Sequence, residues 1–119
     1  MTTDEIGTGL AALCKTGKFD DAIAAYYSNE IVSIEAMPGE MHEMSGIEAI
    51  KGKSAWWAAN HEVHGIEVTG PYFNGDQFVV GFKMDITPKG GQRQIMDEVG
   101  LYTVSGGKIV REVFYYDTK

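Results

Sequence analysis

The sequence MDEVGLYTVSGGKIVREVFYY (Met96–Tyr116) predicts a hairpin of two long β-strands joined by a turn at Ser105-Gly106-Gly107. In a strand, alternate side chains share a face. The two faces that contain glutamates comprise Met96, Glu98, Tyr102 and Val104 on the first strand and Val110, Glu112, Phe114 and Tyr116 on the second. A carboxylate on an apolar, half-buried surface is costly unless something pairs with it or uses it, so Glu98 and Glu112 are candidate functional residues.

The register of this hairpin depends on its turn. A three-residue loop at residues 105–107, with one glycine in the left-handed conformation, would place Glu112 opposite Gly100. Glu98 and Glu112 would then be diagonal neighbours on one face, about 5–8 Å apart at Cβ. A two-residue loop would shift the register by one residue and place the glutamates on opposite faces, so we expect the three-residue loop if they act together.

The rest of the chain predicts three helices before a run of strands. Apolar spacing and capping signals place the helices at about 5–13, 19–29 and 46–61. A short β-branched strand at 31–36 lies between the second and third helices. Turn signals separate strands at about 63–72, 77–87, 92–104 and 108–117. This order indicates one α+β domain, residues 1–119, with three N-terminal helices packed on one face of a curved antiparallel sheet.

The strand at 77–87 has two different faces. Its even-numbered residues from Phe78 to Ile86 are all apolar and are expected to face the helices. The other face combines polar and apolar residues, and its expected continuation on the next strands is Asp97, Val99, Leu101, Arg111, Val113 and Tyr115. That face is too apolar to be wholly solvated, which predicts that it forms the interface of a homodimer.

Composition narrows the possible partners. The 119 residues have a formal net charge of −7, and no cluster of lysine and arginine could follow a phosphate backbone, so no nucleic-acid partner is expected. Cys14 is the single cysteine, which rules out an intrachain disulfide and fits a reducing cytoplasm. The acidic start and the lack of a long apolar run predict neither a signal peptide nor a membrane segment.

Three pieces of sequence resemble a known family over essentially the whole chain. They are Gly17-Lys18-Phe19-Asp20-Asp21-Ala22, the strand region Tyr27–Glu35, and Gly106–Asp117 with its Gly-Gly-Lys-Ile-Val-Arg-Glu motif. The chain resembles the SnoaL-like group of the nuclear transport factor 2-like superfamily, which includes polyketide cyclases and ketosteroid isomerases. The resemblance implies a cone-shaped α+β fold. It specifies the activity poorly, because this fold hosts enzymes, binding modules and assembly factors.

The resemblance also implies roles for particular residues. Glu35 occupies the position of the isomerases' proton-shuttling aspartate, near the end of the first strand. The isomerases' two oxyanion donors correspond to Leu10 and to Gly100 or Val99, none of which has a side-chain donor. The polyketide cyclases use an acid on the later strands, for which Glu98 and Asp97 are both candidates.

Each candidate residue also has a purely structural interpretation. Glu98 and Glu112 could share a dry cavity and supply an acid and a base, or Lys83, Lys108 or Arg111 could neutralise them at the sheet surface. Metal binding by His61 and His64 is not expected, because no third ligand has a recognisable spacing. His61 is a better candidate for an acid, a base or a hydrogen-bond partner. The predicted substrate-binding residues, which could equally be core residues, are Trp57, Tyr27, Met84, Met96, Phe114 and Tyr116.

Together these features predict a pocket that binds a small hydrophobic carbonyl compound. If the protein is an enzyme, we expect proton transfer without a cofactor, as in isomerisation or aldol-type cyclisation, because the sequence contains no phosphate-binding loop or nucleotide motif. Glu35 would be the base and Glu98 or Glu112 the acid, while His61 and Tyr116 would orient the substrate. The alternative is a ligand-binding or dimeric interaction module without turnover.

Overall fold

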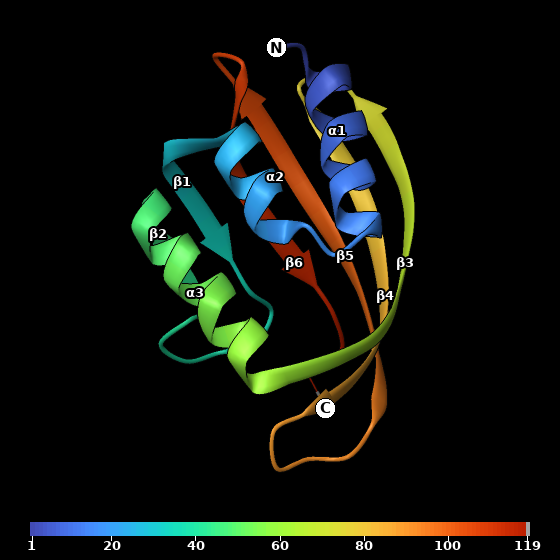
Figure 1. Ribbon diagram of the computed structural model, residues 1–119. Coiled ribbons are helices and arrows are strands. Elements are labelled where there is room, and N and C mark those ends of the chain that lie inside the picture. Colours follow the sequence, from blue (N-terminus) through green and yellow to red (C-terminus); the bar gives the residue numbers. More distant parts are fainter. Residues whose placement is uncertain (119) are drawn as a thin grey trace.

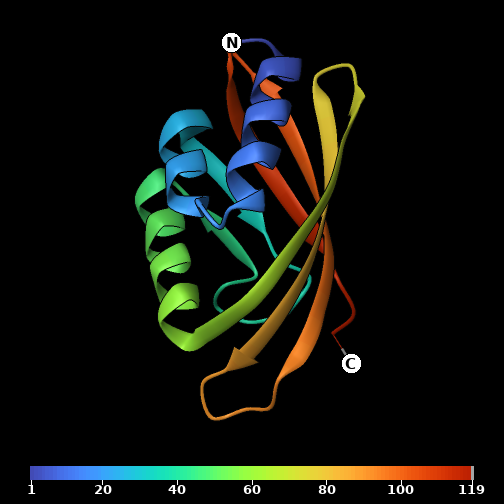
Figure 2. The same ribbon diagram turned by 45° about the vertical axis from the view of Figure 1, so that its right-hand side comes forward.

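The three helices cover one face of a six-stranded, curved and unclosed sheet in the computed structural model, which describes residues 1–118 (Figure 1). Turning the molecule shows that all three helices lie on the same side of the sheet (Figure 2). The helices are α1 (Thr3–Lys15), α2 (Phe19–Tyr26) and α3 (Ile47–Asn60). The predicted α+β fold is therefore confirmed, and none of these helices is long and apolar enough to cross a membrane.

The sheet is mixed rather than wholly antiparallel. Its strands are β1 (Tyr27–Ile34), β2 (Glu43–Ser45), β3 (His61–Asn74), β4 (Gln77–Pro88), β5 (Gln94–Ser105) and β6 (Lys108–Tyr115), in the order β2-β1-β6-β5-β4-β3. The meander from β3 to β6 is antiparallel, as short turns require. The chain's first strand, β1, pairs in parallel with its last, β6, and this pairing has no local signal in the sequence.

The ends of α2 and α3 differ from those predicted, and the first strand, predicted at 31–36, spans residues 27–34. The second helix ends at Tyr26 rather than near Asn29, because residues 27–30 pass directly into the strand that pairs with β6. The third helix ends at Asn60, so His61 is the first residue of β3 and not the last residue of a helix. Pairing with neighbouring strands overrides helical spacing at both places.

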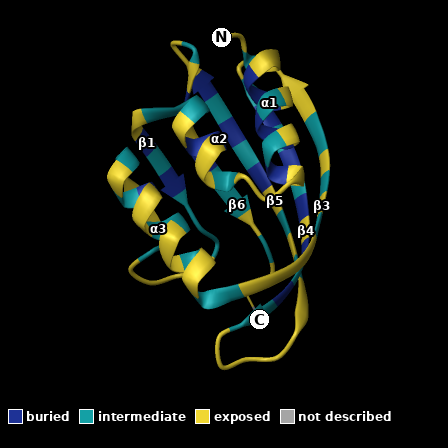
Figure 3. Ribbon diagram, in the orientation of Figure 1, coloured by how far each residue is buried: buried dark blue, intermediate teal, exposed yellow. Residues whose placement is uncertain are grey.

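Burial separates the two faces of the sheet as the alternation predicts. The even-numbered residues of β4, from Phe78 to Ile86, are all buried. Some of them join the core that α1 and α2 complete with Ile6, Leu10 and Ile23. On the opposite face of the sheet, Val99 and Tyr115 are exposed. Figure 3 shows the buried positions on the strands and helix faces that meet inside the molecule.

The hairpin between β5 and β6 has a two-residue turn, so the predicted three-residue loop is wrong. Gly106 and Gly107 both have positive φ, 60° and 76°, and Ser105 pairs with Lys108 across them. Such a turn suits two glycines because both central residues must adopt a conformation that side chains disfavour.

A β-bulge then restores the shared face of the two glutamates. The register shifts between Thr103 and Val104, because Val104 pairs with Ile109 whereas Thr103 pairs with Arg111. The extra residue on β6 moves the pairing by one position, which returns Glu112 to the inner face. Glu112 therefore lies opposite Tyr102 and not opposite Gly100.

Candidate functional site

A cavity of about 870 Å³ lies between the inner face of the sheet and the helices. Its size falls within the range of small-molecule sites. Residues from all three helices, from β3 to β6 and from the segment after β1 form its wall. The structure places all ten predicted site residues on this wall: Tyr27, Glu35, Trp57, His61, Met84, Met96, Glu98, Glu112, Phe114 and Tyr116.

Glu112 is the most buried acid of the cavity. Glu112 is 2% exposed, and the Tyr27 hydroxyl donates to the two oxygens of its carboxylate at 2.7 and 3.1 Å. Burial raises the pKa of Glu112 from 4.5 to about 7, against the smaller opposing effects of the Lys53 charge and the Tyr27 hydrogen bond. Glu112 can therefore gain or lose a proton near neutral pH.

Glu98 has a similar pKa but a different environment. It lies on β5 opposite Phe82, and burial, followed by the negative charge of Glu35, raises its pKa to about 7. Within residues 1–118, no group hydrogen-bonds or ion-pairs with its carboxylate, so the carboxylate is free to contact a ligand. The neighbouring Asp97 is exposed and pairs with Lys83 in the strand register, so Glu98 is the acid that faces the cavity.

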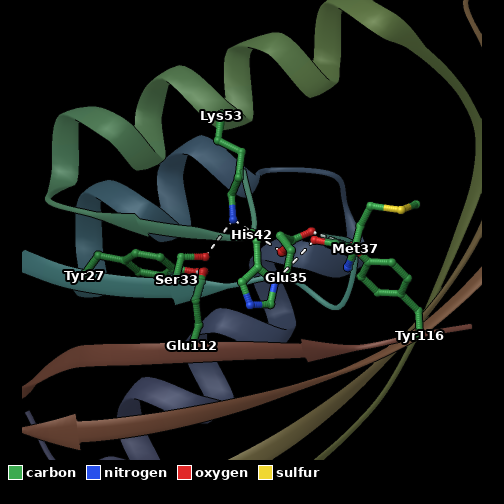
Figure 4. Close-up of polar contacts among 8 residues, drawn as sticks. All are labelled: Tyr27, Ser33, Glu35, Met37, His42, Lys53, Glu112 and Tyr116. Carbon is green, nitrogen blue, oxygen red and sulfur yellow. Dashed lines mark hydrogen bonds and ion pairs between the residues drawn. The ribbon is translucent and has the colours of Figure 1, made fainter. Parts of the chain in front are cut away.

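Glu35, the residue after β1, is held by two partners. Lys53 places its Nζ 3.4 Å from Glu35 Oε2, and the Tyr116 hydroxyl donates to Glu35 Oε1 at 3.2 Å. The Glu35 backbone N–H donates to the carbonyl of His42 at 2.7 Å, which fixes the segment after the strand. Figure 4 shows Glu35, which follows β1, Lys53 of α3 and Tyr116, which follows β6, converging on one another. The carboxylate is therefore oriented by the protein itself.

Lys53 is the functional candidate that the sequence analysis missed. Its Nζ donates to Ser33 Oγ at 2.6 Å and lies 5.4 Å from the centre of the Phe114 ring. A signal existed, because Ile50, Lys53 and Trp57 have the i, i+3, i+7 spacing of one helix face. A lysine on a face with two apolar residues is more informative than a lysine on a polar face.

The three cations of the alternative interpretation, which would neutralise the glutamates at the sheet surface, lie away from them. Lys83 and Arg111 are exposed, and Lys108 donates to the backbone carbonyl of Ala25 at 3.2 Å. That structural alternative does not hold, because strand alternation places Lys83 and Arg111 on the outer face, whereas Lys53 reaches the cavity from α3.

His61 is positioned by the end of α3. Its ring stacks on Trp57 with 4.2 Å between ring centres, and its Nδ1 lies 2.8 Å from the Trp57 carbonyl oxygen. A carbonyl can only accept, so Nδ1 carries a proton in this contact. The His64 Nε2 lies 2.8 Å from Thr87 Oγ1, away from His61's contacts. No three His, Cys, Asp or Glu residues among 1–118 are grouped so that they could hold a metal ion.

Comparison with known proteins agrees with this architecture. The model of the SnoaL-like domain family matches residues 1–116, and no curated protein matches the chain. A Mesorhizobium loti protein assigned as a SnoaL-like polyketide cyclase is 53% identical, with a TM-score of 0.94 and coverage of 98% of this chain and 100% of that one.

More distant structures share the same fold. A Catenulispora acidiphila protein with a ketosteroid isomerase-like fold, solved with trimethylamine, is 26% identical, with a TM-score of 0.76 and coverage of 98% and 88% of the two chains. A SnoaL-like protein from Jannaschia is 17% identical, with a TM-score of 0.76 and coverage of 97% and 85%, and shows the fold alone. From its family match over residues 1–116, this chain belongs to the SnoaL-like domain family.

Proposed function

We propose that the protein is a cofactor-independent enzyme that moves a proton on a small hydrophobic carbonyl compound, in an isomerisation or an aldol-type cyclisation. One observation carries the proposal: Glu98 and Glu112 line the same cavity, and burial raises the pKa of each to about 7. Proton transfer by a side chain is most efficient when its pKa is near the working pH. The assignment of a relative as a polyketide cyclase is consistent with this chemistry.

The proposed roles follow from the partners of each acid. Glu98 is the proton carrier, because its carboxylate has no partner among residues 1–118 and can approach a substrate carbon. Glu112, hydrogen-bonded by Tyr27, is the second acid and can donate a hydrogen bond when it is protonated. Glu35, which the family resemblance suggests as the base, instead orients Lys53 and Tyr116, because it contacts both.

Proton exchange in D₂O tests this proposal with simple ketones in place of the natural substrate. Wild-type protein is incubated with a panel of small aryl and cyclic ketones, and NMR follows the loss of the protons next to the carbonyl. We expect exchange with at least one ketone, and Glu98→Gln should slow it by about 10²- to 10⁴-fold. The exposed Glu67→Gln variant on β3 is the matched control. Equal exchange by Glu98→Gln and wild type would contradict the role of Glu98.

The alternative function is a module that binds a small molecule in the same cavity without converting it. Its supporting observation is that Glu35 and Glu112 are already satisfied by Lys53, Tyr116 and Tyr27, as in a structural network. A ketone that raises the melting temperature of the wild type but undergoes no proton exchange would favour this function.

We also propose that the outer face of the sheet pairs with a second copy of this chain. Ile95, Val99 and Tyr115 are 57%, 40% and 55% exposed on it, and Val99 and Tyr115 are cross-strand partners. A homodimer would cover this face, and Val99→Asp should shift sedimentation to the monomer. Thr8→Asp, exposed on α1, should leave sedimentation unchanged. A wild-type protein that sediments as a monomer at high concentration would refute this assembly.

A further inference from the structure

Proton removal next to a carbonyl needs a donor for the oxygen that becomes negative. Neither position that matches the isomerases' donors can serve: Leu10 is a core residue that is 1% exposed, and Gly100 has no side chain. The alternative match, Val99, is apolar and lies on the outer face. A reaction of the proposed kind therefore needs a donor from elsewhere on the cavity wall.

Lys53 is the one lysine on the described part of this wall, which contains no arginine. Its side chain is only 16% exposed, so little water screens its charge. An ammonium group has three N–H donors. Two acceptors contact it within residues 1–118: Ser33 Oγ at 2.6 Å, and Glu35 Oε2 at a long 3.4 Å. One N–H of Lys53 is thus left for a ligand. The N–H that makes the weak contact with Glu35 can also turn to a ligand.

Other contacts fix the position of this ammonium group. Ser33 is completely buried on β1, and the Phe114 ring lies 5.4 Å from Nζ. Figure 4 shows Lys53 extending from α3 toward Ser33, with Glu112 rising from β6 on the opposite side. The charge of Lys53 also acts on both Glu98 and Glu112, lowering the pKa of each against the effect of burial. A carbonyl oxygen bound at Lys53 would therefore lie in the same compartment as the proposed proton carrier.

We infer that Lys53 binds the carbonyl oxygen of the substrate and stabilises the oxyanion formed during proton transfer. This inference rests on the proposed function. In the step, the C–H bond next to the carbonyl breaks, the proton moves to the Glu98 carboxylate, and the electron pair moves onto the oxygen. Lys53 keeps its own protons and donates a hydrogen bond to that oxygen. Return of the proton from Glu98 to a different carbon of a conjugated enolate, as the electron pair moves back from the oxygen, completes an isomerisation.

The pH dependence of oxyanion binding follows from the groups around Lys53. The titratable groups of the wall are Cys14 on α1, Asp20 on α2, Glu35 and His42 in the segment between β1 and β2, His61 on β3, Glu98 on β5 and Glu112 on β6, together with the tyrosines Tyr27, Tyr102 and Tyr116. An anion is favoured when Glu98 and Glu112 are protonated, and each has a pKa of about 7. Affinity for an oxyanion should therefore be highest below pH 7 and fall above it.

A series of hydrophobic phenols of increasing acidity tests the assignment, because a phenolate resembles an enolate oxygen. Wild-type protein at pH 6 should bind the more acidic phenols more tightly and hold them as phenolates, seen by their absorption. Lys53→Met should weaken this binding by about 10- to 100-fold and remove the dependence on acidity. Lys51→Met is the matched control, because Lys51 is a lysine of α3 with a side chain 54% exposed.

Removing Lys53 leaves Glu35 without its cation, so the single variant could unfold. The double variant Lys53→Met with Glu35→Gln removes both charges and should fold while still failing to hold a phenolate. Wild-type protein that binds no phenol, or that prefers a hydrophobic ammonium ion, would overturn the assignment. Phenolate binding that persists in the folded double variant would also overturn it. Absence of ketone exchange by wild type refutes the proposed reaction instead, so the two failures are distinguishable.

Discussion

Replacing Glu112 by glutamine should change how the stability of this protein depends on pH. Glu112 is 2% exposed, and burial raises its pKa from 4.5 to about 7. Between these pH values the unfolded chain has released the proton while the folded protein keeps it, so the free energy of unfolding falls as pH rises. The cost of the buried carboxyl is absent below pH 4.5 and complete above about pH 7.

The size of the effect follows from the two pKa values. They differ by about 2.5 pH units, and each unit corresponds to about 1.4 kcal/mol, so the full effect of Glu112 is about 3.5 kcal/mol. Glu98 adds a cost of the same sign, because its pKa is also raised to about 7. Glutamine does not titrate, and its carbonyl can still accept from the Tyr27 hydroxyl. As pH rises from 5 to 8, the free energy of unfolding of Glu112→Gln should therefore fall by about 3 kcal/mol less than that of the wild type.

Urea denaturation followed by tryptophan fluorescence at pH 5, 6, 7 and 8 measures this difference. Glu67→Gln, at an exposed position on β3, should keep the wild-type dependence on pH. If Glu112→Gln and wild type lose the same free energy between pH 5 and 8, the reasoning is refuted. A wild-type stability that is constant over this range would also refute it, because Glu112 would then titrate at its unfolded value.

Two further substitutions test the packing around the acids. Tyr27→Phe removes both hydrogen bonds to the Glu112 carboxylate, so the free energy of unfolding should fall by about 1–3 kcal/mol at pH 8 and by less at pH 5. If urea denaturation shows the same loss of unfolding free energy at pH 5 and pH 8, the Tyr27 hydroxyl does not act on the charged Glu112 carboxylate. Gly100→Ala would place a methyl group 2.9 Å from the Tyr102 ring and should cost about 1–3 kcal/mol. In the same urea denaturation, Gly52→Ala, with open space on α3, should raise the free energy of unfolding by up to about 1 kcal/mol. A Gly100→Ala variant as stable as wild type would contradict the Gly100 contact.

Local patterns predicted most of the fold because their physical cause is local. Alternation along β4 identified the buried face from Phe78 to Ile86, and the short turns of the meander required antiparallel neighbours. The predicted end of α2 was wrong because the following residues pair with a strand far away in the sequence. Tyr27 has helical spacing with the residues before it, yet it begins the strand that pairs with β6.

The candidate site was predictable only where side-chain direction follows from alternation or from the family resemblance. Glu98 and Glu112 face the cavity as alternation suggested, although through a two-residue turn and a bulge rather than a three-residue loop. Lys53 was missed because its importance comes from Ser33 and Glu35, which lie 20 and 18 residues earlier in the chain.

The amino-acid sequence by itself determined where the three helices and the five longer strands lie, and which side chains alternate with the acids along β5 and β6. Each of these features depends on side-chain spacing within a few residues. Tertiary structure decided which of these acids has a partner. Tyr27 and Glu112 are 85 residues apart, and they meet because the first and last strands pair in parallel. That pairing is long-range, so no local pattern encodes it. Tyr27 hydrogen-bonds the Glu112 carboxylate, and Lys53 forms an ion pair with the Glu35 carboxylate. The Glu98 carboxylate, by contrast, has no hydrogen bond or ion pair within residues 1–118.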